Sequence, residues 1–158
     1  MVKLLNVIIL VFCLQVSMAG AEEKQILKPS PKDKCPVCGM FVAKYPDWVA
    51  AIRFRDGGTV FFDGAKDMFK YYLDLGKYNP AKKQTDIETL QVSDYYSLTA
   101  TGGFEAFYVI GSDVYGPMGR ALVPFAKEED AQGFMKDHQG KSMVRFKEVT
   151  REMIKGLE

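Results

Sequence analysis

The sequence concentrates its soft metal ligands in one short motif, Cys35-Pro-Val-Cys38-Gly-Met40, which holds two thiols and a thioether within six residues. Thiolates and thioethers favour Cu(I) over hard ions such as Mg²⁺, and methionine is not an ordinary ligand of Zn²⁺. The Cys-x-x-Cys spacing is also typical of zinc knuckles and of thiol–disulfide exchange proteins. The motif therefore indicates one of three chemistries: Cu(I) binding, structural zinc binding or redox exchange.

Redox exchange has the weakest support in the surrounding sequence. A reactive Cys-x-x-Cys pair normally opens a helix, which lowers the thiol pKa, but Gly39 is a poor residue for the first turn of a helix. Residues 30–34, which precede the motif, are polar and do not form the apolar strand expected before such a helix. A local disulfide between Cys35 and Cys38 in a secreted interaction domain is the alternative without metal.

Structural zinc is the second reading, because Cys-Pro-x-Cys-Gly is the turn of a zinc knuckle. A closed zinc site needs four ligands, and the chain has no second cysteine pair. The single histidine, His138, is expected near the C-terminus of a helix, where a partial positive charge is favourable, rather than at a metal. Zinc would therefore require a carboxylate or a second subunit to complete its ligands.

Cu(I) is the reading that we favour, with Cys38 and Met40 as ligands and with Cys35 either bound directly or supporting the turn. Met118 is the candidate for a further ligand. It lies in the loop sequence Gly116-Pro-Met-Gly119, in which a methionine is not expected to fill the core. The other methionines expected in helices and strands occupy apolar positions typical of core packing: Met68, Met135, Met143 and Met153.

The N-terminus predicts export to the periplasm. An apolar run over residues 4–16 follows a basic residue and precedes Ala19-Gly-Ala21, which has the small-residue pattern of a signal-peptide cleavage site. The run is shorter than the roughly 20 residues that a membrane helix needs. We expect cleavage after Ala21, and we do not expect a lipid anchor at Cys13 because the bulky Phe12 precedes it.

Composition excludes several classes of partner. The chain has 21 basic and 20 acidic side chains, and removal of the signal peptide takes away one basic residue, so the mature protein is charge-balanced. The sequence has no basic patch of the kind that would indicate nucleic-acid binding. A hydrophobic content of 47% can form a core without help from a metal or a disulfide. We expect a monomer or a weak dimer whose partner is a protein.

The strand and helix patterns predict an α+β fold. Apolar residues on both sides of the turn sequence Asp56-Gly-Gly58 indicate a hairpin over 48–62. Asp63 is placed to cap a helix over about 64–75. Further strands are expected at 92–99, 104–110, 121–125 and 142–149, an irregular loop at 112–120, and helices at 128–138 and 150–157.

A weak internal repeat suggests two similar lobes. Val60-Phe-Phe62 precedes the first long helix, as Val123-Pro-Phe125 precedes the second, and both helices carry a central phenylalanine. The expected organisation is a signal peptide (1–21), an extended leader (22–34), a first lobe with the cysteine motif (35–80), a connector (81–91) and a second lobe with the Met118 loop (92–158).

Five motifs in this order resemble the NosL family of nitrous-oxide reductase accessory proteins. They are Cys35–Met40, Phe61-Phe-Asp63, Ala106–Ser112, Gly116-Pro-Met-Gly119 and Val123-Pro-Phe125. The resemblance implies two lobes of ββαβ type, similar to part of the organomercurial lyases. It also implies a periplasmic Cu(I) metallochaperone that serves a cupro-enzyme or its assembly machinery, with copper ligands at Cys38, Met40 and Met118. We do not expect an enzyme, because both thiols lie in one turn.

Overall fold

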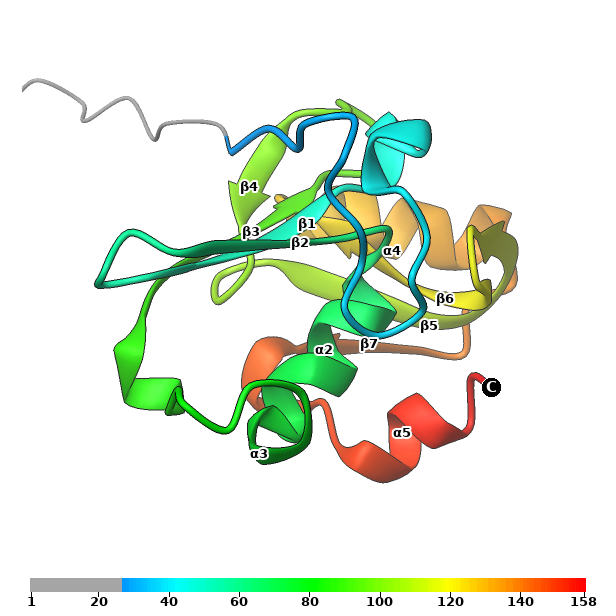
Figure 1. The fold of residues 1–158 in the computed structure, drawn as a ribbon. Coiled ribbons are helices and arrows are strands. Elements are labelled where there is room, and N and C mark those ends of the chain that lie inside the picture. The colour runs from blue at the N-terminus through cyan, green and yellow to red at the C-terminus, as the bar shows by residue number, and fades with distance from the viewer. Residues whose placement is uncertain (1–26) are drawn as a thin grey trace, which may run out of the picture.

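The computed structural model describes residues 27–158 (Figure 1). The expected signal peptide, including Cys13, and residues 22–26 of the leader lie outside the described residues. Within the described part of the chain, no helix is both long and apolar enough to cross a membrane.

The first sheet has four antiparallel strands in the order β2-β1-β3-β4. Its strands are β1 (Ala50–Phe54), β2 (Thr59–Phe62), β3 (Ile87–Ser93) and β4 (Ala100–Gly102). β1 and β2 form the predicted hairpin, with Ala50 opposite Phe62 and Arg53 opposite Thr59. The main helix that follows is α2 (Ala65–Leu73), succeeded by the short α3 (Leu75–Tyr78).

The second sheet has three antiparallel strands in the order β6-β5-β7. Its elements are β5 (Phe107–Gly116), β6 (Gly119–Phe125), α4 (Glu128–Asp137) and β7 (Ser142–Arg145), and α5 (Arg151–Lys155) follows. β1, β2, α2 and β3 have the same order and pairing as β5, β6, α4 and β7, with the first strand in the centre in each case. The predicted α+β class with two ββαβ units is confirmed.

Two cores lie on the opposite faces of the second sheet. The first core joins the first sheet and α2 to one face of the second sheet, through Ile52, Phe69, Tyr108 and Leu122 among others. Phe69 and Tyr108 meet edge to face, with ring centroids 5.0 Å apart. The second core lies on the other face, beneath α4 (Figure 1), and contains Val109, Val123 and Phe134. Neighbouring residues of β5 and β6 point alternately into the two cores. Because the first core also contains side chains of α2, the β5–β6 hairpin is packed against α2.

The strand expected over 92–99 is wrong in its position. β3 begins at Ile87 and ends at Ser93, so it crosses the boundary expected between connector and second lobe and pairs with β1. It stops there because the Asp94 carboxylate accepts the backbone N–H groups of Tyr96 and Ser97 and so closes a turn.

The irregular loop expected over 112–120 is also wrong. β5 continues to Gly116 after a register irregularity between Ile110 and Tyr115, and Gly111 in that region has a φ of 79°. β6 begins at Gly119, so the Met118 loop is the tip of a hairpin. The last strand is shorter than expected, because residues 146–148 form a 3₁₀ turn. Thr150 caps α5, with its side-chain oxygen accepting the Met153 N–H at 3.3 Å.

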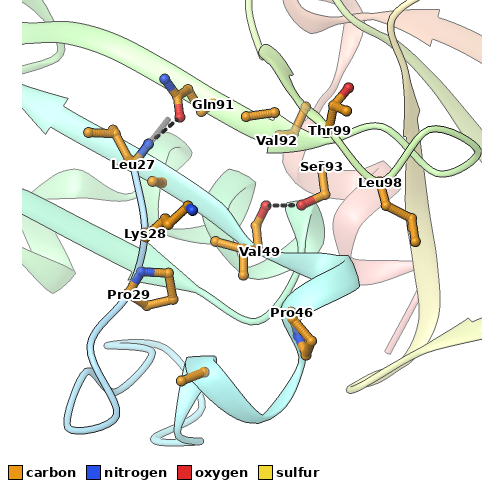
Figure 2. Close-up of a pocket in the computed structure, with 13 residues that line it drawn as sticks. Leu27, Lys28, Pro29, Pro46, Val49, Gln91, Val92, Ser93, Leu98 and Thr99 are labelled. Atoms are coloured by element: carbon orange, nitrogen blue, oxygen red, sulfur yellow. Dashed lines mark hydrogen bonds between the residues drawn. The ribbon is translucent and has the colours of Figure 1, made fainter. Parts of the chain in front are cut away.

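The described part of the leader packs on the outer face of the first sheet. The Leu27 N–H donates to the Gln91 side-chain oxygen at 2.9 Å (Figure 2). An open, largely apolar cavity of about 440 Å³ is bordered by Leu27–Pro29, by Pro46, and by residues 91–93 and 98–100 among others. This contact fixes the chain before it turns into the cysteine motif.

Candidate metal centre

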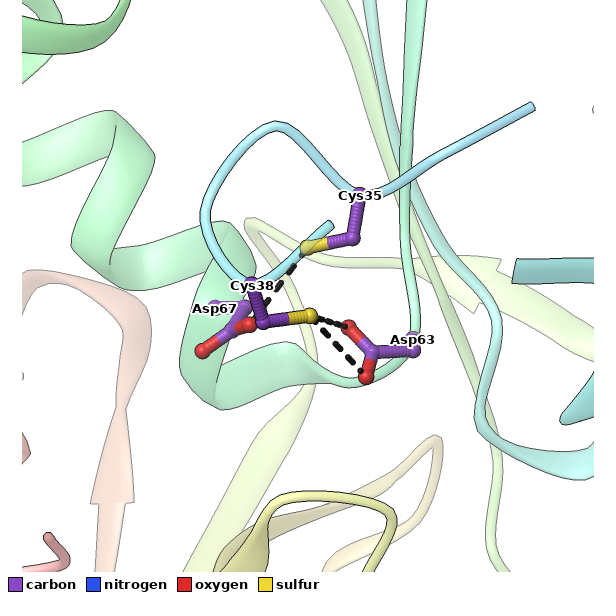
Figure 3. Close-up of side chains that lie close together, drawn as sticks. All are labelled: Cys35, Cys38, Asp63 and Asp67. Atoms are coloured by element: carbon purple, nitrogen blue, oxygen red, sulfur yellow. Dashed lines mark hydrogen bonds between the residues drawn. The ribbon is translucent and has the colours of Figure 1, made fainter. Parts of the chain in front are cut away.

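The cysteine motif folds into a closed turn (Figure 3). The Cys35 N–H donates to the Met40 carbonyl at 2.9 Å, and the Gly39 N–H donates to the Cys35 carbonyl at 2.8 Å. Gly39 has a φ of 80°, a left-handed conformation that glycine adopts without strain. Lys34 and Phe41 pair across the base of the turn. The turn brings both thiols to the same side of the loop, facing the start of α2.

Two aspartates complete a cluster with the thiols. Cys38 Sγ lies 3.3 and 3.4 Å from the two carboxylate oxygens of Asp63, and Cys35 Sγ lies 3.4 Å from Asp67 Oδ2 (Figure 3). One potential ligand atom from each residue lies within 4.8 Å of the others. The cluster therefore offers two sulfur and two oxygen donors to one ion.

The expectation that Asp63 caps α2 is wrong. The N-cap position is occupied by Gly64, and no side chain caps it. Asp63 lies between β2 and the helix and accepts the Cys38 thiol instead. Asp67 lies four residues later, on the first turn of α2, so the junction between β2 and α2 presents both carboxylates to the cysteine turn. This spacing was the signal available in the sequence, but a capping role explained Asp63 equally well.

Both carboxylates of the cluster are buried. Asp63 and Asp67 are 1% and 2% exposed, and Asp67 Oδ1 has no hydrogen-bond partner. Burial of an ionised carboxylate is costly unless it is paired or coordinates a metal. The nearby Lys66 donates its ammonium hydrogens to the carbonyls of Met118 and Leu157. Among the described residues, the two carboxylates form no ion pair, so a bound cation would compensate them.

Both thiols are poor acids in the absence of metal. Burial raises the pKa of Cys35 far above its usual range, against the opposing effect of the Cys38 and Val37 backbone N–H groups. Burial also raises the pKa of Cys38 to about 11, opposed by the Met40 N–H. A redox-active cysteine needs a lowered pKa. Two protonated thiols that donate to carboxylates fit a metal site whose thiol protons leave when metal binds.

The four residues expected at the site differ in their exposure to solvent. Cys35 is buried, Cys38 and Met40 are half-buried, and the Met118 side chain is 44% exposed. Met118 belongs to the second sheet, yet its turn borders the same small cavity as Asp63 and Asp67. The structure thus brings the Met118 turn next to Asp63 and Asp67, the two aspartates that the thiols contact. His138 is elsewhere, at the end of α4, where its Nδ1 lies 3.0 Å from Asp113 Oδ1.

Comparison with known proteins identifies relatives of this chain. The NosL family matches residues 26–154. The copper-binding lipoprotein NosL of Stutzerimonas stutzeri is 27% identical over 164 residues, which cover 92% of this chain and 80% of that protein. The copper chaperone NosL from Shewanella denitrificans has the same fold, with a TM-score of 0.68 at 24% identity over 82% of this chain and 98% of that chain. Neither name denotes an enzyme. The motifs, the fold and a match over most of the chain together make this protein a member of the NosL family.

Proposed function

We propose that this protein is a periplasmic Cu(I) carrier that passes its ion to a cupro-enzyme or to the machinery that assembles one. One observation supports this role: the cysteine turn and the Met118 hairpin both lie next to the same two aspartates, Asp63 and Asp67. The two relatives named above bear copper in their names. The family relation makes nitrous-oxide reductase the first client to test.

The proposed copper ligands are Cys38, Met40 and Met118, with Cys35 either as a fourth sulfur or as the support of the turn. Cys38 is the more accessible thiol, and Met118 lies at the exposed edge of the site, which we call the rim. Soft sulfur donors suit Cu(I), whereas the carboxylates of Asp63 and Asp67 are harder donors. Their negative charge makes the local electrostatic potential more negative and so attracts any cation. Copper held at the rim by sulfur would be stabilised by these charges without being enclosed.

Release to a partner follows from the open side of the site. Cu(I) held by a few sulfurs at a partly exposed rim leaves room for a partner's ligand to bind before the original ligands dissociate. A closed four-ligand site retains its metal, whereas an open position permits exchange. The protein's part in the transfer is to hold the ion and to exclude bulk water on the Cys35 side. The copper–ligand bonds of the partner form as the copper–sulfur bonds of this protein break, and the copper stays Cu(I) throughout.

Native mass spectrometry of protein isolated from the periplasm tests this function. We expect a copper adduct on a chain that begins at residue 22 and carries no lipid, although the Stutzerimonas stutzeri relative is named a lipoprotein. A metal-free chain lighter by two hydrogens would show a disulfide and contradict the proposal. An acylated N-terminus at Cys13 would contradict the expected cleavage after Ala21 without a lipid anchor and would leave the copper-binding proposal untouched.

A second candidate, structural zinc, gains support from one observation. The sequence offered zinc too few ligands, but Asp63 and Asp67 bring the cluster to the four that a closed site requires. Replacement of Asp67 by asparagine keeps the shape and removes one ionised oxygen donor. We expect Asp67→Asn to weaken zinc binding at least about tenfold and Cu(I) binding by less than about threefold, as measured by competition with metal-specific chelators. A larger loss for Cu(I) than for zinc would place copper among the carboxylates.

A further inference from the structure

We propose that Lys66 is a positioning residue that holds the Met118 turn at the metal site. This inference rests on the proposed copper-binding role of Met118. Lys66 lies on the first turn of α2, between Asp63 and Asp67 in sequence, and it is only 6% exposed. Its Nζ donates to the Met118 carbonyl at 2.6 Å and approaches the Leu157 carbonyl at 3.3 Å.

The Met118 turn has a short and constrained backbone. Gly116 pairs with Gly119 across the hairpin, so Pro117 and Met118 are its two central residues. Proline at the first of these positions fixes a negative φ, and Gly119 follows with a φ of 82°, a combination typical of a type I turn with a bulge. The turn shape therefore comes from its own sequence. Its location against α2 needs a contact from outside the hairpin.

Two contacts supply that location. The Trp48 ring packs against Gly116, where an added Cβ would lie 3.3 Å from two ring carbons. Lys66 holds the other side through the Met118 carbonyl. A buried ammonium makes strong, charge-assisted hydrogen bonds because little water competes for them. The backbone of Met118 is thus fixed while its side chain stays partly exposed, which keeps the thioether at the rim and ready to bind.

The charge of Lys66 and its positioning role predict opposite changes in Cu(I) affinity when the ammonium is removed. Lys66 is a cation close to the proposed copper site, so removing its charge would by itself favour the binding of Cu(I). Loss of positioning would act in the opposite direction, because Met118 would no longer be held near the thiols. Weaker copper binding after removal of the ammonium therefore points to position rather than to charge.

A double-mutant cycle tests the inference by Cu(I) competition titration. We expect Lys66→Leu, which removes the ammonium without adding a sulfur, to raise the Kd about tenfold in the parent chain and by less than about twofold in a Met118→Leu background. Lys70→Leu is the matched control, because Lys70 lies on the same helix and pairs with Glu158 instead of with the turn. That control should leave the Kd unchanged in both backgrounds.

The outcomes separate this inference from the proposed function. If Met118→Leu alone leaves the Kd unchanged, the proposed ligand is wrong. If Met118→Leu weakens binding but Lys66→Leu does not, or if Lys66→Leu weakens binding equally in both backgrounds, the positioning role of Lys66 is wrong. X-ray absorption of the copper-loaded Lys66→Leu variant should show one sulfur fewer than the parent. Should that variant fail to fold, Lys66→Gln carries the same cycle, with circular dichroism as the check on folding.

Discussion

The combined substitution Cys38→Ser and Met118→Leu is expected to weaken Cu(I) binding by at least about a thousandfold, or ~4 kcal/mol. A serine hydroxyl is a harder donor than a thiolate, and leucine has the size of methionine but no sulfur. The measurement is an anaerobic competition titration with a Cu(I)-specific chelator. Binding as tight as that of the parent would show that this site assignment is wrong.

Single substitutions divide this effect between the two lobes. Met118→Leu tests the hairpin alone, and Met143→Leu is its control because Met143 packs against the second core. Cys35→Ser asks whether the buried thiol binds copper or only supports the turn. A loss comparable to that of Cys38→Ser would make Cys35 a ligand. A small loss of copper affinity together with a lower melting temperature would make it structural.

Copper binding is expected to strengthen steeply as the pH rises. Both thiol pKa values are raised by burial, that of Cys38 to about 11, so the thiols are protonated near neutral pH and lose their protons when Cu(I) binds. For each proton released, the Kd should fall about tenfold per pH unit below the thiol pKa. A slope near one indicates that Cys38 alone is deprotonated, and a slope near two adds Cys35.

Methionine does not titrate, so the slope counts thiolates only. The Kd is measured from about pH 6 to pH 9, with the chelator's own protonation corrected. A Kd that does not change with pH would exclude thiolate ligation. The raised pKa of Cys38 also means that its protonated form is favoured in the folded metal-free protein. That contribution to stability is present below the ordinary thiol pKa of 9.0 and is lost as the pH rises through about 11.

The elements that sequence predicted well are those with strong local signals. The Asp56-Gly-Gly58 turn and its apolar flanks specified the β1–β2 hairpin, and helical periodicity located α2 and α4. β3 was displaced because Glu88 and Thr89 are both polar and continue a stretch whose composition is typical of a connector. Its pairing with β1 is a contact between residues distant in the chain, which local pattern does not encode.

The two cysteines of the cluster were singled out from the sequence, whereas the two carboxylates beside them were missed. Cys35, Cys38 and Met40 stood out because they place three sulfur side chains within six residues. Asp63 and Asp67 are ordinary in type, and a residue before a helix is read first as a cap. Their role depends on the cysteine turn lying against α2, and that of Lys66 on the hairpin of the other lobe. Both are consequences of tertiary packing.

X-ray absorption at the copper edge of the Cu(I)-loaded protein tests the central claim most directly, because it identifies the atoms bound to the metal. The account predicts a first shell of sulfur only, with thioether as well as thiolate donors, that loses one sulfur in Met118→Leu and none in Met143→Leu. A first shell containing oxygen, or one unchanged by Met118→Leu, would contradict a sulfur site shared between the two lobes.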